Sequence, residues 1–179
     1  DTLSLHDALP IFDDLDTPHV STLRRLVGLA KADATAQRAA ELLEADPTDK
    51  LVLFCLHRQV MTHLCDRLRG HGLVLLAGGE SDWARRDAKE RFQNDPACRV
   101  AVCQMKAAGT GLTLTAANHL WIVEPSWTPA DNDQACKRIV RIGQRRATSI
   151  KFVTLETSID RAVNAVLRKK RQLIDEIVN

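Results

Sequence analysis

Short runs of mostly apolar residues alternate with longer stretches of helical periodicity along this chain. The clearest run is Leu51–Leu56, with the sequence LVLFCL, and others follow at residues 73–77, 100–103, 119–123 and 150–155. Apolar runs of this length without polar alternation are typical of strands buried on both faces. The stretches between them are long enough for helical crossovers between parallel strands. The sequence therefore predicts an α/β fold in which a mostly parallel sheet of five or six strands lies between helical layers.

The connections between the runs carry apolar residues at helical spacing. They predict helices over residues 59–69, 81–92, 128–142 and from Thr157 to about residue 177. Ser81 is a suitable N-cap, and Thr128 followed by proline is a second start signal. Upstream, the pattern predicts one helix beginning at Pro18 and another over residues 34–43, behind Asp33.

The composition is that of a globular domain, with 179 residues of which 45% are apolar and 27% are charged. We assign residues 47–179 to one domain and residues 17–46 to a helical linker that leads into it. Residues 1–16 carry no pattern that continues into the linker, so we interpret them as a disordered or non-native leader.

The cysteines and the hydropathy pattern indicate where such a protein works. Five cysteines, at positions 55, 65, 98, 103 and 136, form no CxxC pair, which favours reduced thiols in a cytoplasmic protein. No apolar stretch reaches the roughly eighteen residues of a membrane span, so we expect no membrane partner. We expect association with the nucleoid if the source is bacterial, and a nuclear location if it is eukaryotic.

One segment interrupts an otherwise balanced charge pattern. The net charge is +2, yet residues 134–155 contain no Asp or Glu. The basic residues of this segment are Lys137, Arg138, Arg141, Arg145, Arg146 and Lys151. A cluster of cations without acids favours an anionic ligand.

Three side chains of this segment are predicted to share one helix face. At about 100° per residue, Gln134, Arg138 and Arg141 fall within about 60° of one another. The opposite face would place Ile139, Val140 and Ile142 against the sheet. Neighbouring guanidinium groups without carboxylates are suited to bind a phosphate, although a solvated basic face is the alternative.

A glycine-containing turn follows the apolar run at residues 100–103. Gly109 and Gly111 flank Thr110 within this turn, and glycine permits positive φ and close approach of backbone N–H groups to an anion. This signal is weak alone. A glycine turn after one strand and an Arg-x-x-Arg segment after the next are together far more specific.

These segments resemble the C-terminal RecA-like lobe of superfamily-two helicases, specifically the Swi/Snf-like DNA translocases. The family motifs read approximately AGGxGLNL, DxxWNP and QAxxRxxRIGQ. The matching segments are Ala107–Leu114, Glu124–Pro129 and Gln134–Gln144. The resemblance implies a three-layer RecA-like lobe.

Other parts of the chain agree with the resemblance. Gly78, Arg85 and Phe92 match a Gly-x6-Arg-x6-Phe element, and Leu23–Lys31 is similar to the HARP-like annealing-helicase branch. The chain departs from the family pattern at Lys137, Val140 and Thr113, where an acid, a histidine and an asparagine are usual.

The resemblance implies that Arg141 is the main arginine finger for ATP, that Arg138 assists it and that Gln134 orients both. The implied nucleotide-binding residues are Gly109, Gly111 and Asp133. The two glycines would lie where the nucleotide and the nucleic acid meet. For Asp133, the alternative is a partner of the helix dipole in the first turn.

The resemblance also implies DNA contacts. The candidates are Thr110, Lys106, Arg85 and Trp127. For Trp127 the alternative is a packing anchor, and for Lys106 and Arg85 it is a solvated charge. His57, His63 and His71 lack metal-ligand spacing, and we predict no metal site in this chain.

The sequence contains no GxxxxGK[ST] phosphate loop, and its one Asp-Glu pair, Asp175-Glu176, falls in a predicted helix. ATP and Mg²⁺ are therefore expected to be held mainly by an N-terminal lobe, with double-stranded or forked DNA as the other partner. We predict that the chain alone hydrolyses no ATP. The alternative is a stand-alone nucleic-acid-binding module that uses residues 134–151, and an RNA helicase lobe is less favoured.

Overall fold

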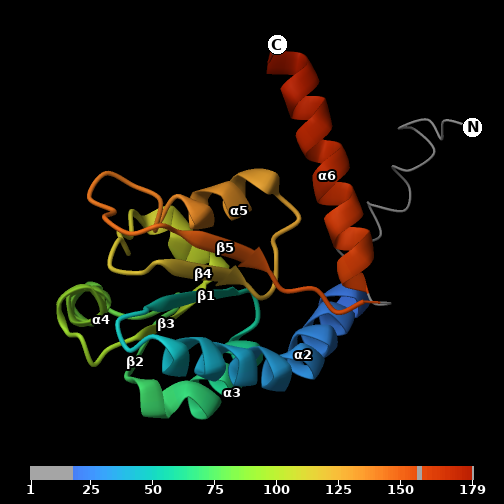
Figure 1. Cartoon of the computed structure of the whole chain (residues 1–179). Coiled ribbons are helices and arrows are strands. Elements are labelled where there is room, and N and C mark those ends of the chain that lie inside the picture. The colour runs from blue at the N-terminus through green and yellow to red at the C-terminus, as the bar shows by residue number, and fades with distance from the viewer. Residues whose placement is uncertain (1–17, 157–158, 179) are drawn as a thin grey trace, which may run out of the picture.

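The computed structural model describes residues 18–156 and 159–178, and it shows a three-layer α/β/α arrangement (Figure 1). Five strands form one sheet in the order β2-β3-β1-β4-β5, and every neighbouring pair is parallel. The strands are β1 (Leu51–Cys55), β2 (Leu73–Leu76), β3 (Val100–Gln104), β4 (His119–Ile122) and β5 (Ser149–Phe152). The predicted α/β fold with five or six strands is confirmed, and each apolar run forms a strand.

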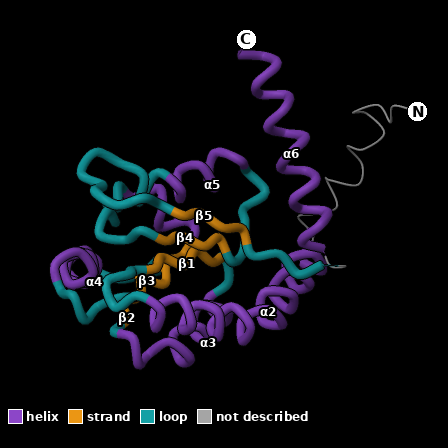
Figure 2. Tube along the Cα trace, viewed as in Figure 1, coloured by secondary structure: helices purple, strands orange, loops and turns teal. Residues whose placement is uncertain are grey.

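Helices cover both faces of the sheet (Figure 2). The α-helices are α2 (Pro18–Ala45), α3 (Arg58–Leu68), α4 (Asp82–Asn94), α5 (Pro129–Cys136) and α6 (Ile159–Val178), and the 3-10 helices are η2 (Arg69–His71) and η3 (Met105–Thr110). Helix α6 projects away from the body of the domain (Figure 1). The predicted leader and the predicted helix start at Thr157 lie outside the described residues. No helix in the described ranges is long and apolar enough to cross a membrane.

The apolar strands serve two separate cores, one on each face of the sheet. Val52 and Phe54 point into the core formed with α4, η3 and α5, where Phe92 is fully buried. Leu51 and Leu53 point the other way, into the core formed with α2 and α3. Each such side chain contributes roughly 1.5–3 kcal/mol by burial, and this explains why β1 is apolar at every position.

Helix α2 is one continuous helix, and the prediction of two helices in this region is wrong. Asp33 does not cap a helix start, because its Oδ1 lies 2.9 Å from both His63 Nε2 and Arg67 Nη2 of α3. The small side chains that pack the second half of α2 into the core are Ala32, Ala36 and Ala39. The predicted linker at residues 17–46 thus includes a helix that forms part of an outer layer.

The first half of α2 approaches the end of β4 closely. A Cβ atom added at Gly28 would lie 2.6 Å from the Glu124 carboxylate oxygen Oε1, so only glycine fits without a shift. At its other end, Arg99 closes the helix by donating from Nη2 to the Leu43 carbonyl over 2.7 Å. Both contacts fix where α2 lies on the sheet.

Helix α5 ends at Cys136, and the prediction that it reaches residue 142 is wrong. Beyond it the chain continues in turns, with Arg138 N donating to Ala135 O over 3.0 Å. The Arg138 carbonyl accepts from Leu114 N over 2.9 Å, where a continuing helix would use it internally. Gly143 then adopts a φ of 102°, which favours glycine.

The early end of α5 changes which apolar side chains are buried. Ile139 is fully buried in the core as predicted, but Val140 is 51% exposed and Ile142 is 100% exposed. The prediction that all three residues pack against the sheet is therefore wrong for Val140 and Ile142.

Candidate functional site

The two predicted fingers lie beside the segment that follows η3, so the structure brings the two main motifs together. Arg138 donates from Nη1 to the Leu112 carbonyl over 3.2 Å, and Arg141 donates from Nη1 to Thr113 Oγ1 over the same distance. The segment around Leu112 runs from the carboxyl end of β3 back toward the amino end of β4. The arginines are therefore next to the glycine turn in space, although residues 134–144 follow a different strand.

The electrostatics of this pair favour an anion. Burial, and then the charge of Arg141, lowers the pKa of Arg138. The Arg138 Nε is buried without a hydrogen-bond partner. Arg141 is exposed. Several arginines in the described ranges form ion pairs, at positions 67, 69, 85, 146 and 171 for example, whereas no ion pair of Arg138 or Arg141 is found there.

The sequence suggested a positive φ within the glycine turn, and the structure shows it at Gly111. Gly111 follows η3 with a φ of 72°, in the left-handed region, and is exposed. Gly109 and Thr110 lie at the end of η3, and the Thr110 side chain is outside what the structure describes. Lys106, also in η3, is exposed. Their predicted contacts with nucleotide or DNA stay predictions.

The remaining two candidates of the nucleotide site lie on α5. Gln134 is exposed near the end of this helix, but the helix stops before Arg138, so the prediction of one helix face shared with the arginines is wrong. Asp133 already has a cation partner, since Arg171 Nη2 of α6 donates to both of its carboxylate oxygens over 2.9 and 3.0 Å. A nucleotide role for Asp133 would compete with that ion pair.

Trp127 is half-buried and contacts other elements through its ring and its backbone. The guanidinium carbon of Arg24 lies 4.7 Å from the ring centroid, a cation–π geometry. Lys170 Nζ of α6 donates to the Trp127 carbonyl over 3.2 Å. These contacts agree with the packing-anchor alternative, and base stacking stays a prediction.

Arg85 lies in the first half of α4, and its side chain is 25% exposed. Its Nη1 lies 3.8 Å from Asp82 Oδ1, and its Nε is buried without a hydrogen-bond partner. Part of the guanidinium is thus fixed within the domain, and the exposed remainder is what a phosphate would reach.

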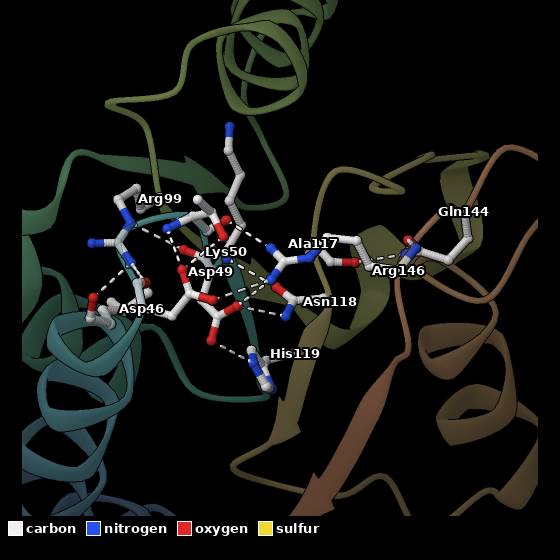
Figure 3. Close-up of polar contacts among 11 residues, drawn as sticks. Asp46, Asp49, Lys50, Arg99, Ala117, Asn118, His119, Gln144 and Arg146 are labelled. Atoms are coloured by element: carbon white, nitrogen blue, oxygen red, sulfur yellow. Dashed lines mark hydrogen bonds and ion pairs between the residues drawn. The ribbon is translucent and has the colours of Figure 1, made fainter.

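A polar cluster at the amino end of the sheet was not predicted (Figure 3). Asp49 accepts from Asn118 Nδ2 and from Arg146 Nη2, both over 2.7 Å, and lies 3.0 Å from His119 Nε2. Burial raises the pKa of Asp49, but hydrogen bonds from these three side chains outweigh it and lower the pKa overall. Arg146 therefore has an internal anion, which corrects the prediction that the whole segment 134–155 seeks an external one.

Gln144 and Lys50 extend this cluster to neighbouring elements. Gln144 Nε2 donates to the carbonyls of Ala117, over 2.7 Å, and of Ile139, over 3.2 Å. Lys50 Nζ donates to Phe92 O over 2.6 Å at the end of α4, and burial lowers the pKa of Lys50. In the sequence, this region shows only the Asp-Pro-Thr-Asp pattern of a turn at residues 46–49, which gives no indication of the partners of Asp49.

Glu124, the acidic residue of the second motif, holds the carboxyl ends of β1 and β4 together. Its Oε2 accepts from the backbone N–H groups of Leu56 and His57 over 3.0 Å, and its Oε1 lies 2.7 Å from His57 Nδ1. The residue is 3% exposed. Its contacts are internal, so we assign it a structural role.

The described residues offer neither a metal cluster nor a reactive thiol. No group of three or more His, Cys, Asp or Glu side chains among them is placed to hold a metal ion. Burial raises the pKa of Cys65 to about 11 and raises that of Cys55 and Cys103 as well, which disfavours thiolate chemistry.

Comparison with known proteins agrees with these features. The sequence profile "Helicase conserved C-terminal domain" matches residues 34–143. An uncharacterized ATP-dependent helicase of Schizosaccharomyces pombe is 33% identical over 147 residues, which is 81% of this chain and 14% of that protein. The DNA annealing helicase and endonuclease ZRANB3 of Homo sapiens is 28% identical over 162 residues, 89% of this chain and 15% of that protein.

A solved structure confirms the fold. The C-terminal part of the Fun30 ATPase domain superposes with a TM-score of 0.64 at 22% identity, covering 86% of this chain and 46% of that one. The chain is therefore a RecA-like helicase lobe, and it belongs to the helicase conserved C-terminal domain family. Its relatives are ATP-dependent helicases of the Swi/Snf type, which include a HARP-like annealing helicase, and the chain spans only about a seventh of the two relatives described above.

Proposed function

We propose that this chain is the second lobe of an ATP-driven translocase on double-stranded DNA and that it supplies Arg141 and Arg138 to ATP held by an N-terminal lobe. The observation that carries the proposal is the arginine pair itself. Both guanidinium groups are fixed by neutral oxygens near Gly111, and neither forms an ion pair in the described part of the chain. Two adjacent cations in this state gain most from a phosphate.

The residues present fit a triphosphate but not its metal ion. Arg141 is exposed and keeps donors beyond the one used by Thr113, whereas the unpartnered Nε of Arg138 is buried and would reach a phosphate only after the side chain moves. Arginine side chains that meet developing charge on a transferred phosphoryl group accelerate hydrolysis by about 10³–10⁵. Asp133 is paired with Arg171, so we expect the carboxylate for Mg²⁺ on the other lobe. ATP supplies the phosphoryl group, and this chain supplies the positive charge.

We expect the DNA contacts on the same side as the glycine turn. Lys106 is exposed there, and Arg85 keeps an exposed part of its guanidinium. Thr110 and Gly109 would add backbone contacts. Such contacts hold the DNA backbone without reading its sequence, as a translocase requires. A relative named as a DNA annealing helicase supports an action on DNA, so we expect this chain to work in the nucleus of a eukaryote or at the nucleoid of a bacterium.

The deciding experiment is Arg141→Ala in the full-length protein. We expect DNA-stimulated ATP hydrolysis to fall by about 10³-fold or more, with most of the DNA affinity retained, because the missing cation acts on the phosphoryl group. Steady-state turnover and fluorescence anisotropy with a DNA duplex measure the two quantities. Arg145→Ala, an exposed arginine of the same segment, is the matched control.

The opposite pattern would support the stand-alone nucleic-acid-binding module. In that case Arg141→Ala would weaken DNA binding and reduce the slope of affinity against salt by about one, while hydrolysis would not depend on it. ATP turnover by the isolated chain would also contradict the two-lobe proposal.

A further inference from the structure

Strand β5 is the last strand of the sheet, and its outer edge has no neighbouring strand among the described residues (Figure 1). Its inner edge pairs with β4, to which the backbone N–H groups of Ser149 and Val153 donate over 2.8 and 2.9 Å. Successive residues of a strand direct their backbone groups to opposite sides. The N–H and C=O groups of Ile150 and Phe152 therefore face away from β4, and no partner for them is found in the described part of the chain.

A groove lies on each face of the sheet beside this edge. Lys151 faces α2, since its Nζ lies 5.5 Å from the ring centroid of Trp121, and both side chains line one groove with Arg38 of α2. Phe152 borders this groove and also lines a second groove, with Leu167 of α6. Side chains of a strand point alternately to the two faces. A strand added along β5 would therefore place its side chains in the two grooves in turn.

The two grooves suit different side chains. Beside α2, Arg38 and Lys151 are exposed, and no ion pair of either is found among the described residues. The acid of this groove, Glu41, accepts from a glutamine one turn earlier in α2 over 3.0 Å. On the other face, Phe152 is 45% exposed. The first groove thus favours acidic side chains, and the second favours apolar ones.

We propose that an extended acidic segment of another protein binds as an additional strand along the outer edge of β5. Its acidic side chains lie in the groove beside α2, and its apolar side chains lie in the groove between α5 and α6. Main-chain hydrogen bonds to Ile150 and Phe152 provide affinity, and the alternating grooves provide selectivity. The proposal does not depend on the proposed function, because this edge contains none of the residues assigned there to ATP or DNA.

Charge and backbone chemistry favour this partner over a second copy of the chain or a nucleic acid. Two copies joined through β5 would bring Lys151 and Arg38 of both chains together, and such like charges repel. A nucleic acid would satisfy these cations. It lacks the regular donors and acceptors of a strand, so the backbone groups of Ile150 and Phe152 would stay unpaired.

The first test compares two synthetic peptides of about nine residues, one alternating Glu with Val and the other Lys with Val, on the full-length protein. We expect only the acidic peptide to bind, measured by fluorescence anisotropy. Lys151→Glu should weaken its binding by about threefold to tenfold, because a cation that faces the acids becomes an anion. Arg145→Glu makes the same charge change at an exposed position outside the grooves and is the matched control. Equal binding of the basic peptide would contradict the proposal.

Ile150→Pro tests the added strand itself. The substitution removes an N–H group that faces away from β4, so the sheet keeps its own ladder while the peptide loses a donor and meets the proline ring. We expect the affinity for the acidic peptide to fall by about tenfold or more, with the unfolding midpoint and ATP turnover close to those of the wild type. Unchanged affinity would overturn the proposal.

Hydrogen–deuterium exchange on the wild-type protein decides the matter without a substitution. We expect the acidic peptide to slow exchange over residues 150–152, and binding without this protection would rule out strand addition. Protection of these residues before any peptide is added would show that the full-length protein covers the edge itself, which would also overturn the proposal. A failure of the proposed function would appear separately, as full hydrolysis by Arg141→Ala.

Discussion

The acid-free segment contains two groups of arginines that look alike in sequence and have different partners in the structure. Arg146 donates to Asp49 over 2.7 Å and to the Thr48 carbonyl over 2.8 Å, so its charge is satisfied within the domain. Arg138 and Arg141 contact only a carbonyl and a hydroxyl group. A local excess of basic residues therefore does not identify a binding site, because a distant carboxylate decides which cations remain available.

The strongest test of this difference is Arg146→Ala. It leaves the carboxylate of Asp49, which is 7% exposed, without its cation. We expect the free energy of unfolding to fall by about 1–3 kcal/mol, because a buried acceptor loses a charged partner. Urea unfolding of the chain measures the loss. Arg141→Ala should leave the unfolding midpoint unchanged. Equal destabilisation by both variants would show that Arg141 contributes as much to folding stability as Arg146 does.

A smaller effect is expected from Thr113→Val, which removes the hydroxyl that accepts from Arg141 over 3.2 Å. The loss of one hydrogen bond that orients the finger should lower kcat for ATP hydrolysis in the full-length protein by about threefold to tenfold. The KM for ATP and the unfolding midpoint serve as internal comparisons. Thr113→Ser keeps the hydroxyl and should restore turnover, and identical kinetics for the two variants would argue against an orienting role.

The smallest effect concerns pH. Folding lowers the pKa of Asp49, so its stabilising contribution is present above the ordinary carboxyl pKa of about 3.9 and is lost as the pH falls through the lower folded value. Asp49→Asn should therefore flatten the acid limb of stability below about pH 4, while lowering stability at neutral pH. Thermal unfolding between pH 2 and pH 7, in about one-unit steps, measures both parts. An unchanged acid limb would assign the acid sensitivity to other carboxyl groups.

The sequence predicted the sheet well because its strands are short, apolar and separated by helical periodicity. It failed where a tertiary contact overrode local pattern. No proline or glycine marks the end of α5 at Cys136, and the helix stops there as the Arg138 carbonyl turns to Leu114 N. Likewise, Asp33 has the residue type of an N-cap but pairs with His63 and Arg67 on another helix.

The candidate site, like the fold, was predicted from the sequence only in part. That the glycine turn and residues 134–144 belong to one site followed from the sequence, although β1 lies between β3 and β4 in the sheet. The partner of Arg146 did not, because Asp49 is 97 residues away in the sequence and no periodic pattern relates two such positions. The exposure of Ile142 was also missed, since its burial was predicted from a helix that ends earlier.

The close approach at Gly28 gives α2 a mechanical property. Without a side chain at this position the helix lies directly against Glu124, and Arg24, one turn earlier, stacks on Trp127. Helix α2 is therefore packed against residues 124–127 at two places one turn apart, so a displacement of the helix would have to displace these residues as well.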